Sequence, residues 1–417
     1  MNFLDDSIVK GHVVNDRLVA EGEKVFYKTY NRFPVVFDRG EGVYLYDKGD
    51  NPYLDFGAGI SVVGLGYSNT LLKRTMEAQI EKGLLHTSNL FYNEPAIEAG
   101  EKLLAASQMD KVFFTNSGTE AIEGALKIAR RYQYNKGKAG CEIIAMQGSF
   151  HGRSIGAVSV TGKDHYREPF APLLPGVKFA TYNDLDSVKA LINENTGAII
   201  LETIQGEGGI YPAEESFLKG IRALCDAHDL LLILDEVQCG MGRSGFMFAW
   251  QEYGVKPDVM AVAKALGNGV PIGAFLAAGK AADAMKPGDH GSTYGGNPFV
   301  CAVAATVLDI FKEAKIPDHA REMGEVLYKE LEEVQKEFPD LVVDHRGKGL
   351  IQGLEFSDRI KASDIVKEAL LTQHMVLIGA EHNTIRFVPP LIIEKYQIQD
   401  MKERLTAAMK ALQKETH

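Results

Sequence analysis

The spacing of apolar residues changes near residue 57, and this change separates two kinds of predicted element. Before it, short apolar runs alternate with turns rich in glycine and charge, which is typical of an antiparallel meander. The predicted strands there are 35–37, 43–46 and 53–56, with turns at 39–42 and 48–51. After residue 57, wholly apolar runs alternate with amphipathic helical segments. Such strands suit a sheet that is covered on both faces, and the helices between them imply parallel crossovers.

The predicted strands of this second part are 112–114, 142–146, 198–201, 231–234 and 259–262. The pattern changes again around 298–315, where charged helices begin, followed by strand pieces at 341–343 and 353–356. A last helix repeats apolar residues as a stripe that faces a core, made of Ile398, Met401, Leu405, Met409 and Leu412. We therefore predict an α/β protein with a large domain over 57–297. A small α+β domain would combine residues 1–56 with residues 298–417.

Length and charge restrict the class of protein. A chain of 417 residues exceeds the usual size of a single core, so two domains are expected. The net charge of −11 argues against general affinity for nucleic acid. The four cysteines form no Cys-x-x-Cys pair, residues 1–6 carry no export signal, and no apolar run approaches a membrane span. We expect a reduced, cytoplasmic protein without membrane or nucleic-acid partners.

Two charged residues stand where apolar strands end. Lys264 follows the run 259–262, and Asp235 ends the run 231–234, 29 residues earlier. A lysine among hydrophobic residues loses hydration, which lowers its pKa and makes its amine a nucleophile toward carbonyls. An acid at a strand end suits a pyridine-type cofactor, because it keeps the ring nitrogen protonated. Alone, each residue has an ordinary structural interpretation, but together they predict a pyridoxal phosphate site.

The other predicted strands also end in polar or small residues. Residues 115–121 form a strand-to-helix turn whose backbone N–H groups suit a phosphate, although a capped helix without a ligand is an equal alternative. Phe150 can stack on a flat ring and Arg153 can hold a carboxylate, although core and surface positions are their commoner uses. Residues 202–209 form a polar, Gly-rich loop. Because ligands bind beyond the carboxyl ends of parallel strands, five such ends indicate one shared cofactor site.

These motifs resemble those of the class III pyridoxal-phosphate-dependent aminotransferases, and within them the acetylornithine aminotransferase branch. The resemblance runs nearly from end to end and is dense in 85–92, 114–120, 150–153, 204–209, 234–245, 263–273, 291–298 and 385–390. It implies the type I fold of pyridoxal-phosphate-dependent transferases, whose large domain has a mostly parallel sheet of the seven-stranded type. It also implies a homodimer in which the two subunits share their active sites.

The resemblance assigns roles residue by residue. Lys264, Asp235 and Glu207 would be catalytic. The cofactor would be held by Ser117, Gly118, Thr119, Phe150, Asp235, Val237, Gln238, Lys264 and, from a neighbouring subunit, Thr293. The substrate would be bound by Arg153, Glu207, Ser292 and Arg386, with no metal. In particular, Glu207 would pair with Arg386 while an ω-amino donor is bound and release it for a dicarboxylate.

The function implied is transfer of the ω-amino group of N-acetylornithine to 2-oxoglutarate. The products would be N-acetylglutamate 5-semialdehyde and glutamate, in arginine biosynthesis. Ornithine, succinylornithine and 4-aminobutyrate remain alternative donors, and an aminomutase, a racemase or a silent binding protein built on this scaffold remain alternative classes. The chain departs from the family at 66–70, where Gly-Tyr-Ser-Asn-Thr replaces a Gly-His-x-His-Pro-like turn. By the resemblance this turn lies near the substrate entrance, so the departure bears on donor preference.

One further motif, Gly-x-Gly-x-x-Gly at 240–245, follows a strand as a dinucleotide site would. Residues 235–238 intervene and place a carboxylate where a pyrophosphate would approach, and the stretch 246–253 is short for the required helix. We therefore do not predict nicotinamide binding.

Overall fold

The computed structural model describes residues 15–415, so the N-terminal stretch judged to lack an export signal lies outside the described residues. The large sheet has the strand order β4-β12-β11-β10-β7-β5-β6. Its strands are β4 (Lys111–Thr115), β12 (Gly273–Ala277), β11 (Val259–Val262), β10 (Leu231–Asp235), β7 (Thr196–Glu202), β5 (Glu142–Met146) and β6 (Val177–Ala180). Every pairing is parallel except those of β12, which runs against both of its neighbours.

The five strands predicted for this sheet are confirmed, and so is the mostly parallel α/β architecture. Sequence analysis did not predict β6 and β12. Alternate residues of each central strand enter different parts of the core: Ile233 packs with α5 (Gly118–Asn135), whereas Leu234 packs with α9 (Glu215–His228). The sheet is thus covered on both faces, which explains why its strands are apolar at every position.

The N-terminal meander forms a second sheet of β1 (Phe37–Glu41), β2 (Tyr44–Asp47), β3 (Pro52–Asp55) and β15 (Met375–Val376), in which β15 pairs parallel with β3. The prediction of a first strand at 35–37 and a turn beginning at Arg39 was wrong, because Arg39 and Gly40 lie inside β1. A Cβ atom on Gly40 would lie 2.5 Å from Cγ of Tyr67. The glycine is therefore needed to admit the tyrosine ring and does not mark a turn.

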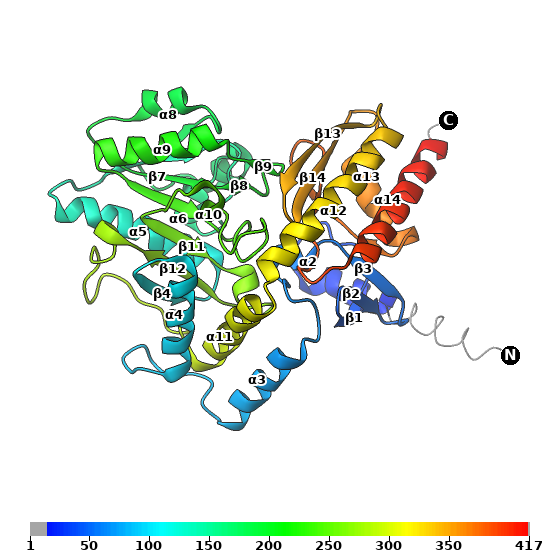
Figure 1. The fold of residues 1–417 in the computed structure, drawn as a ribbon, viewed down its shortest axis with the longest axis horizontal. Coiled ribbons are helices and arrows are strands. Elements are labelled where there is room, and N and C mark those ends of the chain that lie inside the picture. The colour runs from blue at the N-terminus through cyan, green and yellow to red at the C-terminus, as the bar shows by residue number, and fades with distance from the viewer. Residues whose placement is uncertain (1–14, 416–417) are drawn as a thin grey trace.

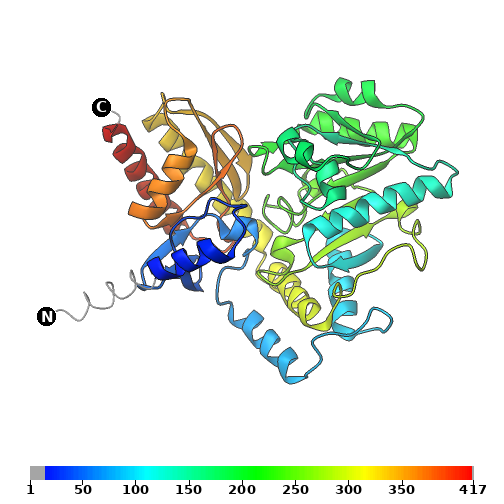
Figure 2. The ribbon, with the colours of Figure 1, turned by 180° about the vertical axis from the view of Figure 1, so that it is seen from behind.

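The C-terminal part forms an antiparallel sheet of β13 (Val342–Lys348), β14 (Ile351–Phe356), β17 (Thr384–Phe387) and β16 (Ile378–Ala380). The helices α12 (Ile316–Glu337), α13 (Ala362–Thr372) and α14 (Lys395–Glu415) pack on and beside it. The predicted apolar stripe of the last helix is confirmed, since Ile398, Met401, Leu405 and Met409 are fully buried. Both ends of the described chain lie on the same side of the large sheet (Figures 1 and 2).

A long helix, α11 (Pro298–Glu313), packs against α3 (Thr70–Glu81) and α4 (Glu94–Ser107) on the side of the large sheet (Figure 1). Our limit between the large and small domains at residues 297 and 298 stays a prediction. Among the described helices, none combines the length and the hydrophobicity that a bilayer crossing requires.

The segment that joins the N-terminal sheet to the rest of the chain contains an unusual turn, α2 (Ala58–Ser61). Its φ angles are 46° at Ala58, 61° at Gly59, 64° at Ile60 and 62° at Ser61, so the turn is left-handed. Left-handed helical geometry costs an L-residue about 1–2 kcal/mol, and it is least favourable for a β-branched residue such as isoleucine. Surrounding contacts must therefore hold this turn in place.

Candidate active site

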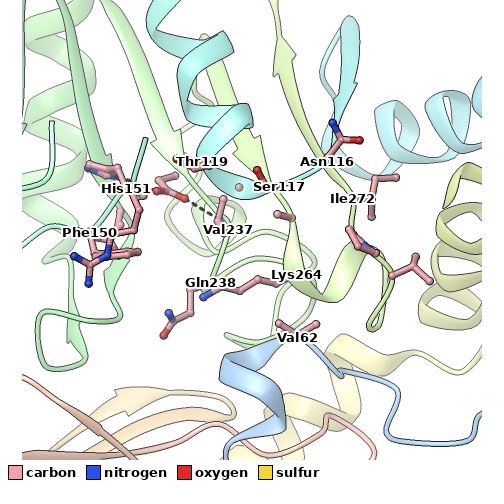
Figure 3. A pocket seen from close by; sticks show the side chains of 18 of the residues that line it. Val62, Asn116, Ser117, Thr119, Phe150, His151, Val237, Gln238, Lys264 and Ile272 are labelled. Carbon is pink, nitrogen blue, oxygen red and sulfur yellow. Dashed lines mark hydrogen bonds and ion pairs between the residues drawn. The ribbon is translucent and has the colours of Figure 1, made fainter. Parts of the chain in front are cut away.

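A cavity of about 410 Å³ opens at the carboxyl ends of the parallel strands. Nine of the thirteen predicted site residues line it, namely Ser117, Gly118, Thr119, Phe150, Arg153, Asp235, Val237, Gln238 and Lys264 (Figure 3). The sequence prediction missed other lining residues, among them Val62, Asn116, His151, Glu202 and the segment 269–272. Within residues 15–415 there is no group of three His, Cys, Asp or Glu side chains placed to bind a metal.

Lys264 follows β11 and begins the short 3-10 turn η2 (Lys264–Leu266), with a φ of 50°. Burial lowers the pKa of Lys264 to about 8. The carboxylate of Glu207 opposes this shift, and the guanidinium of Arg386 adds to it. About a tenth of the amine is therefore uncharged at pH 7, and this uncharged form is the nucleophile toward a carbonyl.

Asp235 ends β10 and is held in the cavity wall by two contacts. Its Oδ1 accepts a hydrogen bond from the Val237 N–H (2.9 Å), and its Oδ2 lies 2.7 Å from Nδ1 of His151. Burial disfavours the charged imidazole, but the hydrogen bond and the charge of Asp235 raise the pKa of His151. The His151 Nε2 atom is buried, and no residue in the described part of the chain forms a hydrogen bond with it. The 2.7 Å contact with His151 thus holds the Asp235 carboxylate in place in the cavity wall.

A second carboxylate, Glu202, adjoins this pair because it is the register partner of Asp235 on β7. Its oxygens accept hydrogen bonds from the N–H groups of Phe150 (3.0 Å) and Gly206 (3.2 Å). Burial raises the pKa of Glu202 to about 7, and the nearby charge of Asp235 acts in the same direction. The sequence does carry a signal that could have identified Glu202 as a site residue, because it directly follows the apolar run 198–201.

Glu207 and Arg386 form a bidentate ion pair beside the cavity, with N–O distances of 2.6 and 3.1 Å. Arg386 comes from β17, and Glu207 from the hairpin loop between β8 (Ile204–Gln205) and β9 (Tyr211–Pro212). Burial works against the charge of Glu207, but Arg386 outweighs it and lowers the pKa of Glu207. Arg386 also donates to Oε1 of Gln238 (3.1 Å), so the NH₂ group of Gln238 is the donor left for a ligand.

The start of α5 forms the opposite end of the cavity. Ser117 caps the helix, since its Oγ accepts a hydrogen bond from the Glu120 N–H (3.3 Å). The N–H groups of Gly118 and Thr119 open the helix and have no carbonyl one turn earlier to bond, so they can receive an anion. A Cβ atom on Gly118 would lie 2.8 Å from Cγ1 of Val237, so only glycine fits there without a shift.

Of the predicted residues not yet described, Arg153 lines the cavity, whereas Ser292 and Thr293 do not. Arg153 is exposed and stacks on the ring of Tyr166, with its guanidinium carbon 3.7 Å from the centroid. Ser292 contacts the cavity wall through Asn116, whose Nδ2 lies 3.4 Å from the Ser292 Oγ. Thr293 is exposed and does not line the cavity of its own chain. Its predicted role in the site of a neighbouring subunit stays a prediction.

Comparisons with known proteins agree on one family. The model of the family described as aminotransferase class-III matches residues 25–409. The acetylornithine aminotransferase of Clostridium acetobutylicum is 47% identical over 372 residues, which cover 89% of this chain and 95% of that protein. The solved ornithine aminotransferase of Toxoplasma gondii is 31% identical, with a TM-score of 0.92 and coverage of 96% of both chains. The acetylornithine aminotransferase of Elizabethkingia anophelis is 32% identical, with a TM-score of 0.84 and coverage of 94% of this chain and 98% of the other.

A third buried carboxylate gives a test of these electrostatics. Glu236 accepts hydrogen bonds from the N–H groups of Ala249 and Trp250, both at 2.9 Å, and burial raises its pKa to about 7. The folded protein thus binds this proton more tightly than the unfolded chain. The stability that this proton contributes is fully present below about pH 4.5 and is lost as pH rises through about 7. For a shift of this size, the free energy of unfolding falls by up to about 3 kcal/mol.

Glu236→Gln should therefore reduce the loss of thermal stability between about pH 5 and pH 8. Glu202, Asp55 and His151 also have raised pKa values in the folded protein, so part of the slope should remain. The measurement is the midpoint of thermal unfolding across this pH range, with the exposed Glu214→Gln as control. A slope identical in the wild type and in Glu236→Gln would contradict the prediction.

Proposed function

The chain belongs to the class-III aminotransferase family, and from this premise we propose that it transfers the ω-amino group of N-acetylornithine to 2-oxoglutarate. The products are N-acetylglutamate 5-semialdehyde and glutamate, a reaction of arginine biosynthesis. The observation that carries the proposal is the bidentate pair of Glu207 and Arg386 next to the partly deprotonated amine of Lys264. The cavity then offers a nucleophile together with an arginine whose charge is already neutralised.

Pyridoxal phosphate is the cofactor of this family, and the residues of the cavity fit it. We propose that Lys264 bonds to its aldehyde, Asp235 to its ring nitrogen and the Gln238 amide to its phenolic oxygen. Phe150 and Val237 would cover the two ring faces, and Ser117, Gly118 and Thr119 would hold the phosphate. When bound, the cofactor withdraws electrons from the amine-bearing carbon of the substrate, so that a proton can leave that carbon. The contact of Asp235 with His151 holds its carboxylate in place for this role.

Lys264 would also act as a proton carrier. Its Nζ, when uncharged, would take up the proton that leaves the amine-bearing carbon of the donor and hold it until it is returned to the reacting molecules. Efficient proton transfer requires a pKa near the working pH, and the lowered pKa of Lys264, about 8, meets this condition.

The pair of Glu207 and Arg386 would select between the two substrates. While Glu207 and Arg386 are paired, the charge of the arginine is neutralised, so it tolerates the long neutral arm of N-acetylornithine. When 2-oxoglutarate binds, the Glu207 side chain swings away and Arg386 receives the second carboxylate, while Arg153 holds the α-carboxylate. The backbone of Glu207 is fixed by Lys163, whose Nζ donates to the Glu207 carbonyl at 2.9 Å. Only the side chain then has to move.

We also propose that the protein is a cytoplasmic homodimer whose subunits share their sites through Thr293 and Ser292. Next to these residues lies an apolar surface made of Leu90, Phe91, Tyr92 and Tyr294. The side chains of these residues are exposed to solvent when the chain is alone. The two segments are joined, since Asn89 donates to the carbonyl oxygens of Ser292 (2.9 Å) and Gly295 (2.8 Å). A second copy of the chain would cover this surface and complete the phosphate site.

A panel of donors tests the proposed substrate. With 2-oxoglutarate as acceptor, kcat/KM should be highest for N-acetylornithine, ahead of ornithine, succinylornithine and 4-aminobutyrate. A higher value for one of the other donors would reassign the substrate. Formation of glutamate separates a transferase from an aminomutase or racemase, because those enzymes keep the amino group on one molecule.

Lys264→Ala should lower turnover by roughly three orders of magnitude or more, because it removes both the covalent anchor and the proton carrier. Steady-state transamination at saturating pyridoxal phosphate measures the loss. Lys280→Ala is the matched control, since Lys280 bonds to Asp229 and to the Leu230 carbonyl on another part of the surface. Near-normal turnover by Lys264→Ala would show that another group carries the reaction.

Glu207→Gln should slow the half-reaction with the ω-amino donor more than the half-reaction with glutamate. An amide cannot neutralise Arg386, so the exposed positive charge disfavours the neutral arm of the donor while still attracting a carboxylate. Single-turnover kinetics of the two half-reactions measure this difference. Equal losses in both would refute the proposed switch.

A further inference from the structure

The left-handed turn at Ala58–Ser61 leads directly into the cavity. Its amides close the turn, with Ser61 N–H donating to the Gly57 carbonyl (3.0 Å) and Val62 N–H to the Ala58 carbonyl (2.7 Å). The next residue along the chain, Val62, lines the cavity below the Lys264 side chain (Figure 3). The position of this wall therefore depends on a strained turn that relaxes unless it is held.

The first end of the turn is held by Asp55, which is completely buried. Its Oδ1 accepts hydrogen bonds from the N–H groups of Gly57 (2.8 Å) and Ala58 (2.9 Å). Its Oδ2 accepts a hydrogen bond of 2.6 Å from the hydroxyl of Tyr67. One carboxylate thus joins the start of the turn to a side chain that follows it.

Tyr67 is itself fixed to the N-terminal sheet. Its N–H donates to the Gly42 carbonyl (2.8 Å), and the Gly42 N–H donates back to the Tyr67 carbonyl (3.1 Å). Its ring occupies the space that the missing side chain of Gly40 leaves free. The hydroxyl therefore approaches Asp55 from a rigid base.

The second end of the segment is held by Asn268. Its Oδ1 accepts a hydrogen bond from the Leu65 N–H (2.6 Å), and its Nδ2 donates to the Gly66 carbonyl (3.2 Å). Asn268 belongs to the loop that follows Lys264, in which residues 269–272 line the same cavity. The segment that carries Val62 is thus clamped between the N-terminal sheet and the lysine loop.

We propose that Tyr67 is a positioning residue for the amino donor: by holding Asp55 it fixes the left-handed turn, and with it the place of Val62 in the cavity wall. The inference rests on the proposed function, because it concerns the fit of that donor. Tyr67 stands in the turn where the chain departs from the histidine-containing pattern of the family it resembles, so the clamp uses a phenol in this chain.

The test compares Tyr67→Phe with Tyr53→Phe in the full chain saturated with pyridoxal phosphate. Tyr53 is a matched control, since its hydroxyl also donates to an aspartate, Oδ2 of Asp47 (3.2 Å), but at the turn between β2 and β3 rather than at the left-handed turn. Amide hydrogen exchange over residues 57–66 should become about tenfold faster in Tyr67→Phe, the size expected for loss of a hydrogen bond to a carboxylate. Tyr53→Phe should leave these residues unchanged.

Kinetics provide the second measurement. Tyr67→Phe should raise KM for the best donor about five- to tenfold while kcat changes less than about threefold, because the wall no longer orients the donor. If Tyr67→Phe does not fold, Asn268→Ala opens the other end of the clamp and should raise exchange at residues 64–66 and KM together.

Unchanged exchange in Tyr67→Phe, or equal effects of Tyr67→Phe and Tyr53→Phe, would overturn the inference. Faster exchange with unchanged KM would also overturn it, because the turn would then have no influence on the donor. A wild type that transfers no amino group from any donor would refute the proposed function instead, while the exchange measurement would still decide whether Tyr67 holds the turn.

Discussion

The removal of water from the Lys264 amine is the constraint on which the rest of the site depends. Burial brings the pKa of this lysine down to about 8, and it also forces every neighbouring charge to find a partner. Glu207 is paired with Arg386, and Asp235 is paired with His151. The cavity is thus lined and flanked by buried charged groups that are held in pairs.

The parallel sheet makes this set possible because it brings successive strand ends to one edge. The register of β10 on β7 places Asp235 beside Glu202, so two carboxylates share one buried region. Backbone N–H groups from the neighbouring loops, at Phe150 and Gly206, satisfy the oxygens of Glu202. The strand order therefore decides which acids interact, and hence which of them titrates near neutral pH.

The C-terminal sheet adds the part of the site that a single sheet edge cannot supply. Arg386 reaches the cavity from β17, and Arg346 donates to the Gly209 carbonyl at 2.8 Å, which holds the loop that carries Glu207. Together with the clamped turn before Val62, these contacts fix the backbone around a side chain that has to move. A rigid frame of this kind lets one carboxylate exchange partners without disturbing the lysine.

The sequence by itself determined the residue types and the elements with strong local patterns. Wholly apolar runs predicted five strands of the large sheet, the spacing of the last helix predicted its buried stripe, and the strand-end positions of Lys264 and Asp235 indicated the chemistry. It missed β6 and β12 and misplaced the first strand, because the glycine at Gly40 serves a ring that comes 27 residues later. Only the tertiary structure decided that Asp235 meets His151, 84 residues away, whereas the pairing of Glu207 with Arg386, 179 residues apart, was implied by the family resemblance. Burial and distance set the pKa of a group, and both arise only when remote segments pack together.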